Sequence, residues 1–327
     1  MEFRLEWYVR IFFTGKNFAQ GLKEVDATSL ALVAQLNGIT VSKSLTSLVD
    51  LLVCVDYENP ALKMVKKATR LGVRRVLIVN EPEVVIPQHA KGRILKKFDK
   101  VIYVGRPMRN PKLKWPQTWT DLRRKDHRIQ RAVVVNADKW SFVGGHHYWL
   151  RAAISVKDSR VDVYGPGWSR PLMERSLHRG VDLVRTLLSR TAPSFRGLRY
   201  ILAKPKQYLG IADDKVETMS HYKVALVIEN SSEVMTEKLF DAWFAGCVPV
   251  FVGPPVRGMD VPEHLVVESN PDIESVKTAI DLALSVDIQQ FQEELESFLL
   301  SRAALEWQAE RAILKILTEA TTTNSAS

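Results

Sequence analysis

The sequence contains few cysteines and no long apolar run. Of its 327 residues only Cys54 and Cys247 are cysteines, and each lies in a strand-like apolar run, which favours small core residues over a disulfide or a metal pair. No apolar run approaches the roughly 18 to 20 residues that a membrane-spanning helix needs. Residues 1–6 carry acidic side chains where a signal peptide has basic ones. We therefore expect a cytoplasmic protein.

Several catalytic motifs are also absent. No Asp-x-Asp triplet occurs, which argues against transferases that bind a diphosphate through a divalent ion. There is no Gly-x-x-x-x-Gly-Lys-Ser/Thr loop for ATP or GTP hydrolysis, and no Gly-x-Ser-x-Gly nucleophile elbow. No His and Cys set with zinc-ligand spacing accompanies His146 and His147. We predict that the protein has no metal site and requires no cofactor.

The chain is basic, with a net charge of +9 from 46 Lys and Arg against 37 Asp and Glu. The basic residues concentrate in residues 91–131, a pattern typical of a solvated surface and also suited to nucleic acid, anionic lipid or a phosphorylated substrate. This stretch lacks interleaved aromatic residues, and no known nucleic-acid-binding signature occurs. We expect no nucleic-acid partner and favour an anionic membrane surface. Polynucleotide binding that weakens steeply with salt would instead support a nucleic-acid partner.

Strand-like apolar runs alternate with helical patterns along the chain. This alternation predicts an α/β protein with parallel, doubly wound sheets. We predict two Rossmann-like domains, the GT-B architecture, with a polar hinge over 107–131 and an apparent insertion over 170–220. We expect a first domain at 1–128 that holds the acceptor and a second domain at 129–300 that binds the nucleotide sugar. A C-terminal helix is expected at 301–320, with a return to the first domain as one option, and a disordered tail at 321–327.

Residues 222–253 have the pattern strand, polar loop, helix, glycine, strand. Residues 224–228 are continuously apolar, as in a buried parallel strand, and Glu229 and Asn230 follow directly. Thr236 is expected to cap the helix. Polar groups at the carboxyl ends of parallel strands line the ligand crevice of an open α/β sheet. The pattern therefore predicts a ligand site here, lined by Glu229, Asn230, Thr236, Glu237 and Lys238.

The start of the predicted helix supplies the charged groups of this site. A helix that begins with Lys238 favours an anion, and Glu237 beside it is placed to accept hydrogen bonds from ribose hydroxyls. The alternative interpretation is a capped helix with a solvated Glu–Lys pair. By pattern alone, both interpretations stay open.

The same segment resembles the nucleotide-sugar signature of glycosyltransferase family 10, the α-1,3/1,4-fucosyltransferases. It contains Ile-Glu-Asn-Ser, then Val-Met-Thr-Glu-Lys, then Ala-Gly-Cys-Val-Pro-Val-Phe-Val-Gly, in the family's order. The resemblance implies the GT-B fold and implies that Asn230, Glu237 and Lys238 hold the GDP part of GDP-fucose. The loop before Thr236 is shorter than in the family, and Val234 stands where the family has tyrosine.

Residues 76–87 give a second match, an apolar strand running into Asn-Glu-Pro. The resemblance implies that Glu81 is the catalytic base. A carboxylate within hydrogen-bond reach of the acceptor hydroxyl can take its proton as that hydroxyl attacks the anomeric carbon. Glu83 is the nearest rival. The alternative interpretation is that Glu81 is a turn carboxylate before Pro82.

A third match covers residues 132–165, where family members have an arginine that binds the diphosphate. Arg151 is the best match, since a guanidinium fits phosphate oxygens, although its spacing to the following strand is short. His146 and His147 compete for this role. Polar residues at a Gly-Gly turn are the more ordinary interpretation of the two histidines.

The resemblance implies an inverting, metal-independent transfer of L-fucose from GDP-fucose to a glycan hydroxyl, in α-1,3 or α-1,4 linkage. Lys238 and Arg151 would neutralise the GDP phosphates, Glu237 would hold ribose, and Asn230 would orient the sugar or a phosphate. The acceptor would be an oligosaccharide or a lipid-linked glycan, reached at the inner membrane face. The alternatives are a GT-B transferase that uses another nucleotide sugar and a catalytically inactive glycan- or nucleotide-binding protein.

Overall fold

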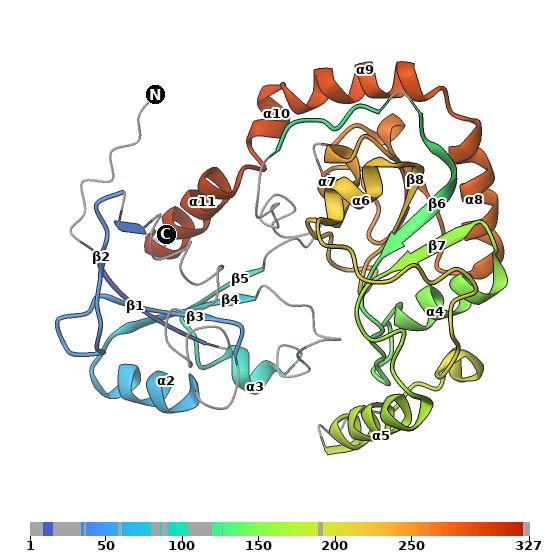
Figure 1. The fold of residues 1–327 in the computed structure, drawn as a ribbon. Helices are drawn as coiled ribbons and strands as arrows, with labels where there is room; N and C mark the ends of the chain where they lie inside the picture. The colour runs from blue at the N-terminus through green and yellow to red at the C-terminus, as the bar shows by residue number, and fades with distance from the viewer. Residues whose placement is uncertain are drawn as a thin grey trace. The chain divides into compact units, whose positions relative to one another are not determined.

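The computed structural model forms two compact units (Figure 1). Unit 1 consists of residues 1–117 and 306–327, and unit 2 of residues 118–305. Within these units the structure describes residues 9–15, 34–35, 37–57, 61–79, 86, 91–103, 120–125, 127–188, 192–259 and 261–322. In the described ranges, no helix combines the length and the apolar composition needed to cross a bilayer.

Unit 1 contains a five-stranded parallel sheet with the strand order β2-β1-β3-β4-β5. Its strands are β1 (Arg10–Gly15), β2 (Thr40–Val41), β3 (Leu51–Val55), β4 (Arg74–Val79) and β5 (Lys100–Tyr103). The helices described in unit 1 are α2 (Ala61–Arg70), α3 (Gly92–Leu95) and the C-terminal α11 (Ala309–Thr321).

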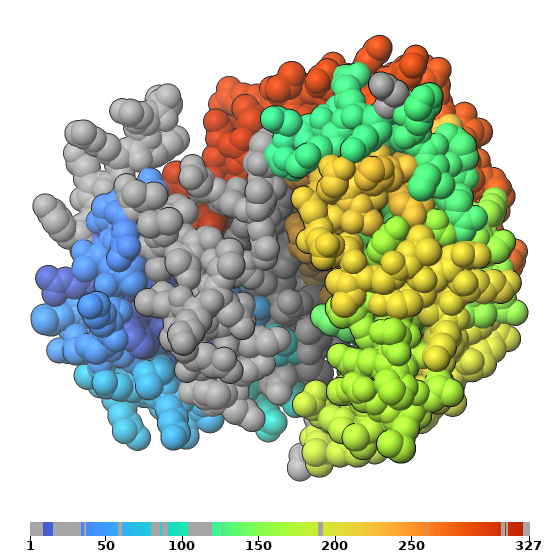
Figure 2. Space-filling view, in the orientation of Figure 1, coloured from blue at the N-terminus to red at the C-terminus, as the bar shows by residue number. Residues whose placement is uncertain are grey.

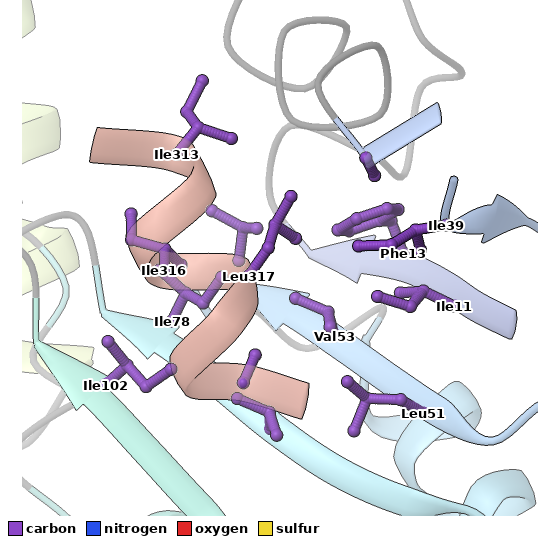
Figure 3. Close-up of a cluster of buried hydrophobic side chains, with 14 residues drawn as sticks. Ile11, Phe13, Ile39, Leu51, Val53, Ile78, Ile102, Ile313, Ile316 and Leu317 are labelled. Carbon is purple, nitrogen blue, oxygen red and sulfur yellow. The ribbon is translucent and has the colours of Figure 1, made fainter. Parts of the chain in front are cut away.

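Helices cover both faces of this sheet. Along β3, Leu51, Val53 and Val55 join one core cluster and Leu52 and Cys54 join the other, as the alternation of side chains along a strand requires. The first cluster contains residues of α11, which lies on the strands in Figure 3, and the second contains residues of α2 and α3.

Unit 2 contains a second five-stranded parallel sheet, in the order β10-β9-β8-β6-β7. Its strands are β6 (Ile129–Val135), β7 (Val161–Tyr164), β8 (Tyr222–Ile228), β9 (Val248–Val252) and β10 (Val267–Glu268). Its α-helices are α4 (Tyr148–Lys157), α5 (Leu172–Leu188), α6 (Lys215–Ser220), α7 (Lys238–Phe244), α8 (Ile273–Ser285), α9 (Ile288–Leu299) and α10 (Arg302–Leu305). Short 3-10 turns lie at Leu198–Tyr200 and Glu263–Leu265.

The two sheets share one topology. In chain order each reads second, first, third, fourth, fifth strand, which is a doubly wound arrangement. In unit 2 the chain winds outward from β6 to β7 and then, from β8, in the opposite direction. The winding therefore reverses between β6 and β8, and the carboxyl ends of these two strands flank the crevice in which such sheets bind ligands. The predicted α/β class and the two Rossmann-like domains are confirmed.

Both cysteines are buried core residues, Cys54 in β3 and Cys247 before β9, and neither forms a disulfide. Burial raises the pKa of both thiols. The structure therefore agrees with the expectation of two small core residues.

The limits of the two units differ from those expected from the sequence. Residues 118–128, assigned above to the first domain, include Arg123, whose backbone N–H donates to Phe244 O at 2.7 Å, and Arg124, which pairs with Glu296 at 2.7 Å. These contacts place the stretch in unit 2. The single helix predicted over 301–320 is wrong, because α10 ends before residue 306 and α11 begins at residue 309.

Candidate functional site

The site is built at the carboxyl end of β8. Residues 224–228 of this strand are buried between β6 and β9, and Glu229 follows them, fully buried. The backbone N–H of Glu229 donates to Val252 O at 2.7 Å, which extends the pairing with β9 by one residue. A Cβ at Gly253 would lie 2.6 Å from the Phe251 ring and 3.0 Å from Cγ of Glu229. Glycine at this position therefore lets the end of β9 approach the carboxylate.

Glu229 organises the polar groups around it. Its carboxylate accepts from the backbone N–H of Thr236 at 2.7 Å, from Oγ1 of Thr236 at 2.8 Å and from Nζ of Lys238 at 2.8 Å. A buried carboxylate is tolerated when a cation and hydrogen bonds compensate its charge. The loop from Glu229 to Lys238 is therefore closed by the carboxylate of Glu229.

This arrangement corrects the role expected for Thr236. The N-cap position of α7 is occupied by Glu237, which makes no side-chain capping bond. The Thr236 hydroxyl donates to Glu229 at 2.8 Å and accepts from the backbone N–H of Lys238 only at 3.5 Å. Lys238 is the first residue of α7, and its side chain is 19% exposed. Glu237 is half-buried beside it.

Arg151 approaches the same loop from α4. Its Nη2 donates to the backbone oxygen of Ile228 and, at 3.0 Å, to Oδ1 of Asn230. The residue is 4% exposed, and burial lowers the pKa of its guanidinium. Its guanidinium carbon lies 4.7 Å from the centre of the Tyr148 ring. In this structure Arg151 therefore fixes the side chain of Asn230.

The two histidines that precede α4 belong to the same cluster. The backbone N–H of His147 donates to Asn230 O at 3.1 Å, and a ring nitrogen of His147 lies 3.3 Å from Oγ of Ser232. Burial, followed by the charge of Arg151, lowers the pKa of His146 to about 2 and that of His147 to about 4. Both histidines are neutral at physiological pH and add no positive charge.

Asn230, Thr236, Lys238 and Arg151 thus meet around Glu229, although Arg151 comes from a segment of the sequence far from the other three. Glu229 was recognised from the sequence only as a polar strand end, and its central role was missed. Its position in Ile-Glu-Asn, directly after the apolar run 224–228, was the available signal. The predicted base, Glu81, and its rival, Glu83, lie outside the described residues.

The site can bind an anion through cationic side chains. Lys238 lies at the carboxyl edge of the sheet, and an ammonium has three N–H donors, of which Glu229 and Thr236 engage two. A pocket of about 250 Å³ in unit 2 is lined by Tyr148 together with Asp138, Arg175 and Arg179, and none of the residues of the Glu229 cluster lines it. Among the side chains that the structure describes, no three His, Cys, Asp or Glu residues gather as metal ligands.

Comparison with curated sequences finds similarity over a short segment. No protein-family model matches the chain. A curated Arabidopsis thaliana protein, described as fucosyltransferase-like, is 52% identical over 44 residues, which is 13% of this chain and 9% of that protein. The chain therefore matches under a tenth of that relative's length.

Solved structures match almost the whole fold. A crystal structure of an α1,3-fucosyltransferase has a TM-score of 0.55 and 15% identity, over 96% of this chain and 91% of that chain. The structure of an α1,3-fucosyltransferase with GDP has a TM-score of 0.53 and 14% identity, over 97% and 93%. HepE of Anabaena, in complex with UDP and glucose, has a TM-score of 0.56 and 12% identity, over 96% and 100%. The chain therefore has the GT-B fold and resembles the α1,3-fucosyltransferases of glycosyltransferase family 10.

Proposed function

We propose that this protein is a glycosyltransferase that transfers L-fucose from GDP-fucose to a hydroxyl group of a glycan. The observation that carries this proposal is the cluster around Glu229, at the reversal point of a doubly wound sheet. The family 10 signature coincides with this cluster. The similarity to an α1,3-fucosyltransferase with GDP supports GDP-fucose as the donor.

In this proposal the donor diphosphate binds to Lys238. The ammonium keeps its bonds to Glu229 and Thr236, and its third N–H donates to a phosphate oxygen. The carboxylate of Glu229 fixes the direction of that donor but touches no substrate. A cation held in this way stabilises the negative charge that develops on the departing GDP.

Asn230 and Glu237 complete the donor site. Asn230 orients the sugar or a phosphate, and Glu237, at the first turn of α7, accepts from the ribose hydroxyls. Arg151 is a positioning residue for Asn230, because its Nη2 already donates to Oδ1 of that residue. Its buried positive charge adds to the field at the carboxyl ends of β6 and β8.

The reaction proceeds with inversion at the anomeric carbon. The acceptor oxygen attacks that carbon, the bond to the GDP oxygen breaks, and the acceptor proton passes to a carboxylate. We propose Glu81 as this base. No metal is required, since side-chain cations offset the phosphate charge, and the linkage formed is α-1,3 or α-1,4. The acceptor is an oligosaccharide or a lipid-linked glycan, and the reaction takes place on the cytoplasmic side of the membrane.

A donor screen tests the proposal. Release of GDP from GDP-fucose and of UDP from UDP-sugars would be measured with an array of glycan acceptors. We expect GDP-fucose to be the preferred donor and Lys238→Ala to reduce its turnover. Lys277→Ala is the matched control, because Lys277 also pairs with a glutamate, Glu274 at 3.0 Å, but lies on the surface of α8.

The similarity to HepE with UDP and glucose favours one alternative, a transferase that uses a UDP-sugar. Preferential release of UDP would support it and refute GDP-fucose as donor. GDP binding without release of GDP from GDP-fucose with any acceptor would indicate an inactive binding protein.

A further inference from the structure

Helix α5 has an inverted amphipathic pattern. In a surface helix the apolar side chains ordinarily face the protein and the polar ones face water. In α5 the buried residues are Arg175, Arg179 and Thr186. The apolar side chains Met173 and Leu177 instead face outward, 85% and 70% exposed. The helix therefore presents an apolar face to its surroundings.

The inner face of α5 is fixed by buried charges. Arg175 pairs with Asp138 at 2.7 Å and is 1% exposed, and Arg179 pairs with the same carboxylate at 2.5 Å. Arg175 also donates to the backbone oxygens of Leu202 and Ala203, at 3.0 and 2.9 Å. Turning the helix to hide its apolar face would leave these charges uncompensated, which is costly. The outward direction of the apolar face is thus built into unit 2.

The exposed apolar face extends along the length of the helix. Its 17 residues span about 25 Å at 1.5 Å per residue. Leu188 near the C-terminal end is 78% exposed, and more than half of each side chain is exposed at the positions between, Val184 and Leu187. Figure 2 shows the yellow-green surface of α5 at the lower edge of unit 2. Contiguous exposed apolar surface of this kind marks an interaction site.

The charge around α5 indicates what covers this face. Residues 170–206 contain nine Lys and Arg but only two Asp and Glu. Arg175 and Arg179 are buried against Asp138, and the other charged residues of the segment sum to +5, seven basic against two acidic. Arg185, on α5 itself, is exposed. Lys204 and Lys206 are exposed too, directly after the backbone that receives Arg175.

We propose that the apolar face of α5 docks on an anionic lipid bilayer. Apolar side chains enter the interface between headgroups and acyl chains while neighbouring basic residues are attracted to anionic headgroups. A second copy of the chain is disfavoured as the occupant, because self-association would bring together two segments that each carry +5 outside the buried Asp138 pairs. The inference does not depend on the proposed reaction, since lipid binding needs neither donor nor acceptor.

Vesicle sedimentation tests the proposal with the full chain. Vesicles of phosphatidylcholine with phosphatidylglycerol would be compared with vesicles of phosphatidylcholine alone, at low and high salt. The test variant is Met173→Gln with Leu177→Gln, which keeps good helix formers on exposed positions. We expect binding to the anionic vesicles to decrease on the order of tenfold or more in this variant. The matched control, Leu282→Gln with Leu300→Gln, changes two exposed leucines outside α5 and should bind like wild type.

Circular dichroism would verify that both variants are folded. Weaker binding to neutral vesicles, and weakening by salt, would support the role of the basic segment. Equal binding to anionic and neutral vesicles would refute the role of the basic segment. Absence of vesicle binding, or binding unaffected by the α5 substitutions, would overturn the proposal. Self-association in sedimentation velocity that the α5 variant abolishes, without vesicle binding, would show that a second copy covers the face and would also overturn it.

Discussion

Lys238→Met separates the structural and the ligand-binding roles of Lys238. Methionine keeps the length and the helix propensity of lysine but carries no charge. In the structure the buried Glu229 accepts from two groups of Thr236 and from Nζ of Lys238. The substitution leaves the carboxylate with two of its three donors and without its neighbouring cation. We therefore expect unit 2 to lose stability even when no ligand is bound.

The size of this loss follows from the burial of the pair. Removing a hydrogen bond to a charged group costs about 1.5 to 3 kcal/mol, and breaking a fully buried ion pair costs about 3 to 5 kcal/mol. Glu229 is fully buried, but the Lys238 side chain is 19% exposed, so water partly replaces the ammonium. We expect a loss of about 2 kcal/mol, which for a unit of this size lowers Tm by about 4 to 8 °C.

A double-mutant cycle with Glu229→Gln checks the reasoning. The amide can still accept from Thr236, but its NH2 group would face the Lys238 ammonium, so Glu229→Gln alone is also destabilising. With Lys238→Met present, neither an unpaired charge nor a donor facing a donor remains. The double variant should therefore lose less stability than the sum of the two single variants. Additive losses in urea unfolding would refute the coupling of the pair.

Calorimetry with GDP then isolates the second role. If the third N–H of Lys238 contacts a phosphate, Lys238→Met should weaken GDP binding about ten- to a hundredfold. Unchanged GDP affinity together with lower stability would show that Lys238 serves Glu229 alone, and the donor-site proposal would fail. Lys277→Met, which removes an exposed pair on α8, should change neither quantity appreciably.

Three further predictions concern the base, the metal and the histidines. Glu81→Gln should reduce transfer about a hundred- to ten-thousandfold with GDP-fucose affinity nearly intact, whereas an inactive Glu83→Gln beside an active Glu81→Gln would reassign the base. Turnover should survive EDTA, and complete loss restored only by Mn²⁺ or Mg²⁺ would contradict charge neutralisation by side chains. Burial and Arg151 lower the pKa of His146 to about 2 and that of His147 to about 4. As pH falls, the two histidines are therefore protonated in the unfolded chain at a higher pH than in the folded chain. The free energy of unfolding should therefore decrease as pH falls below about 6.5, and His147→Gln should flatten this decrease in urea unfolding between about pH 7 and about pH 5.

Local pattern was sufficient for the sheets and for the order of strand, loop and helix around the candidate site. The continuous apolar run of β8 and the Thr-Glu-Lys that follows its loop are features of neighbouring residues, so their order in the sequence indicates strand, loop and helix. The alternation of such units indicated doubly wound parallel sheets. This pattern does not predict which group each polar side chain hydrogen-bonds to in the folded protein. Thr236 was expected to cap α7, but its hydroxyl faces Glu229.

Tertiary structure decided the roles that depend on distant segments. Arg151 has the chemistry of a phosphate ligand, yet its guanidinium donates to the backbone oxygen of Ile228 at the end of β8. These two residues are 77 positions apart in the sequence. The face that α5 buries was likewise set from outside the helix. Its periodicity defines an apolar stripe and a polar stripe, and the apolar one would ordinarily face inward. Asp138 and the backbone oxygens of residues 201–203 compensate Arg175 and Arg179 and so hold the polar stripe inside. A helix orients by its best-compensated face, and the groups that compensate α5 lie in other parts of the chain.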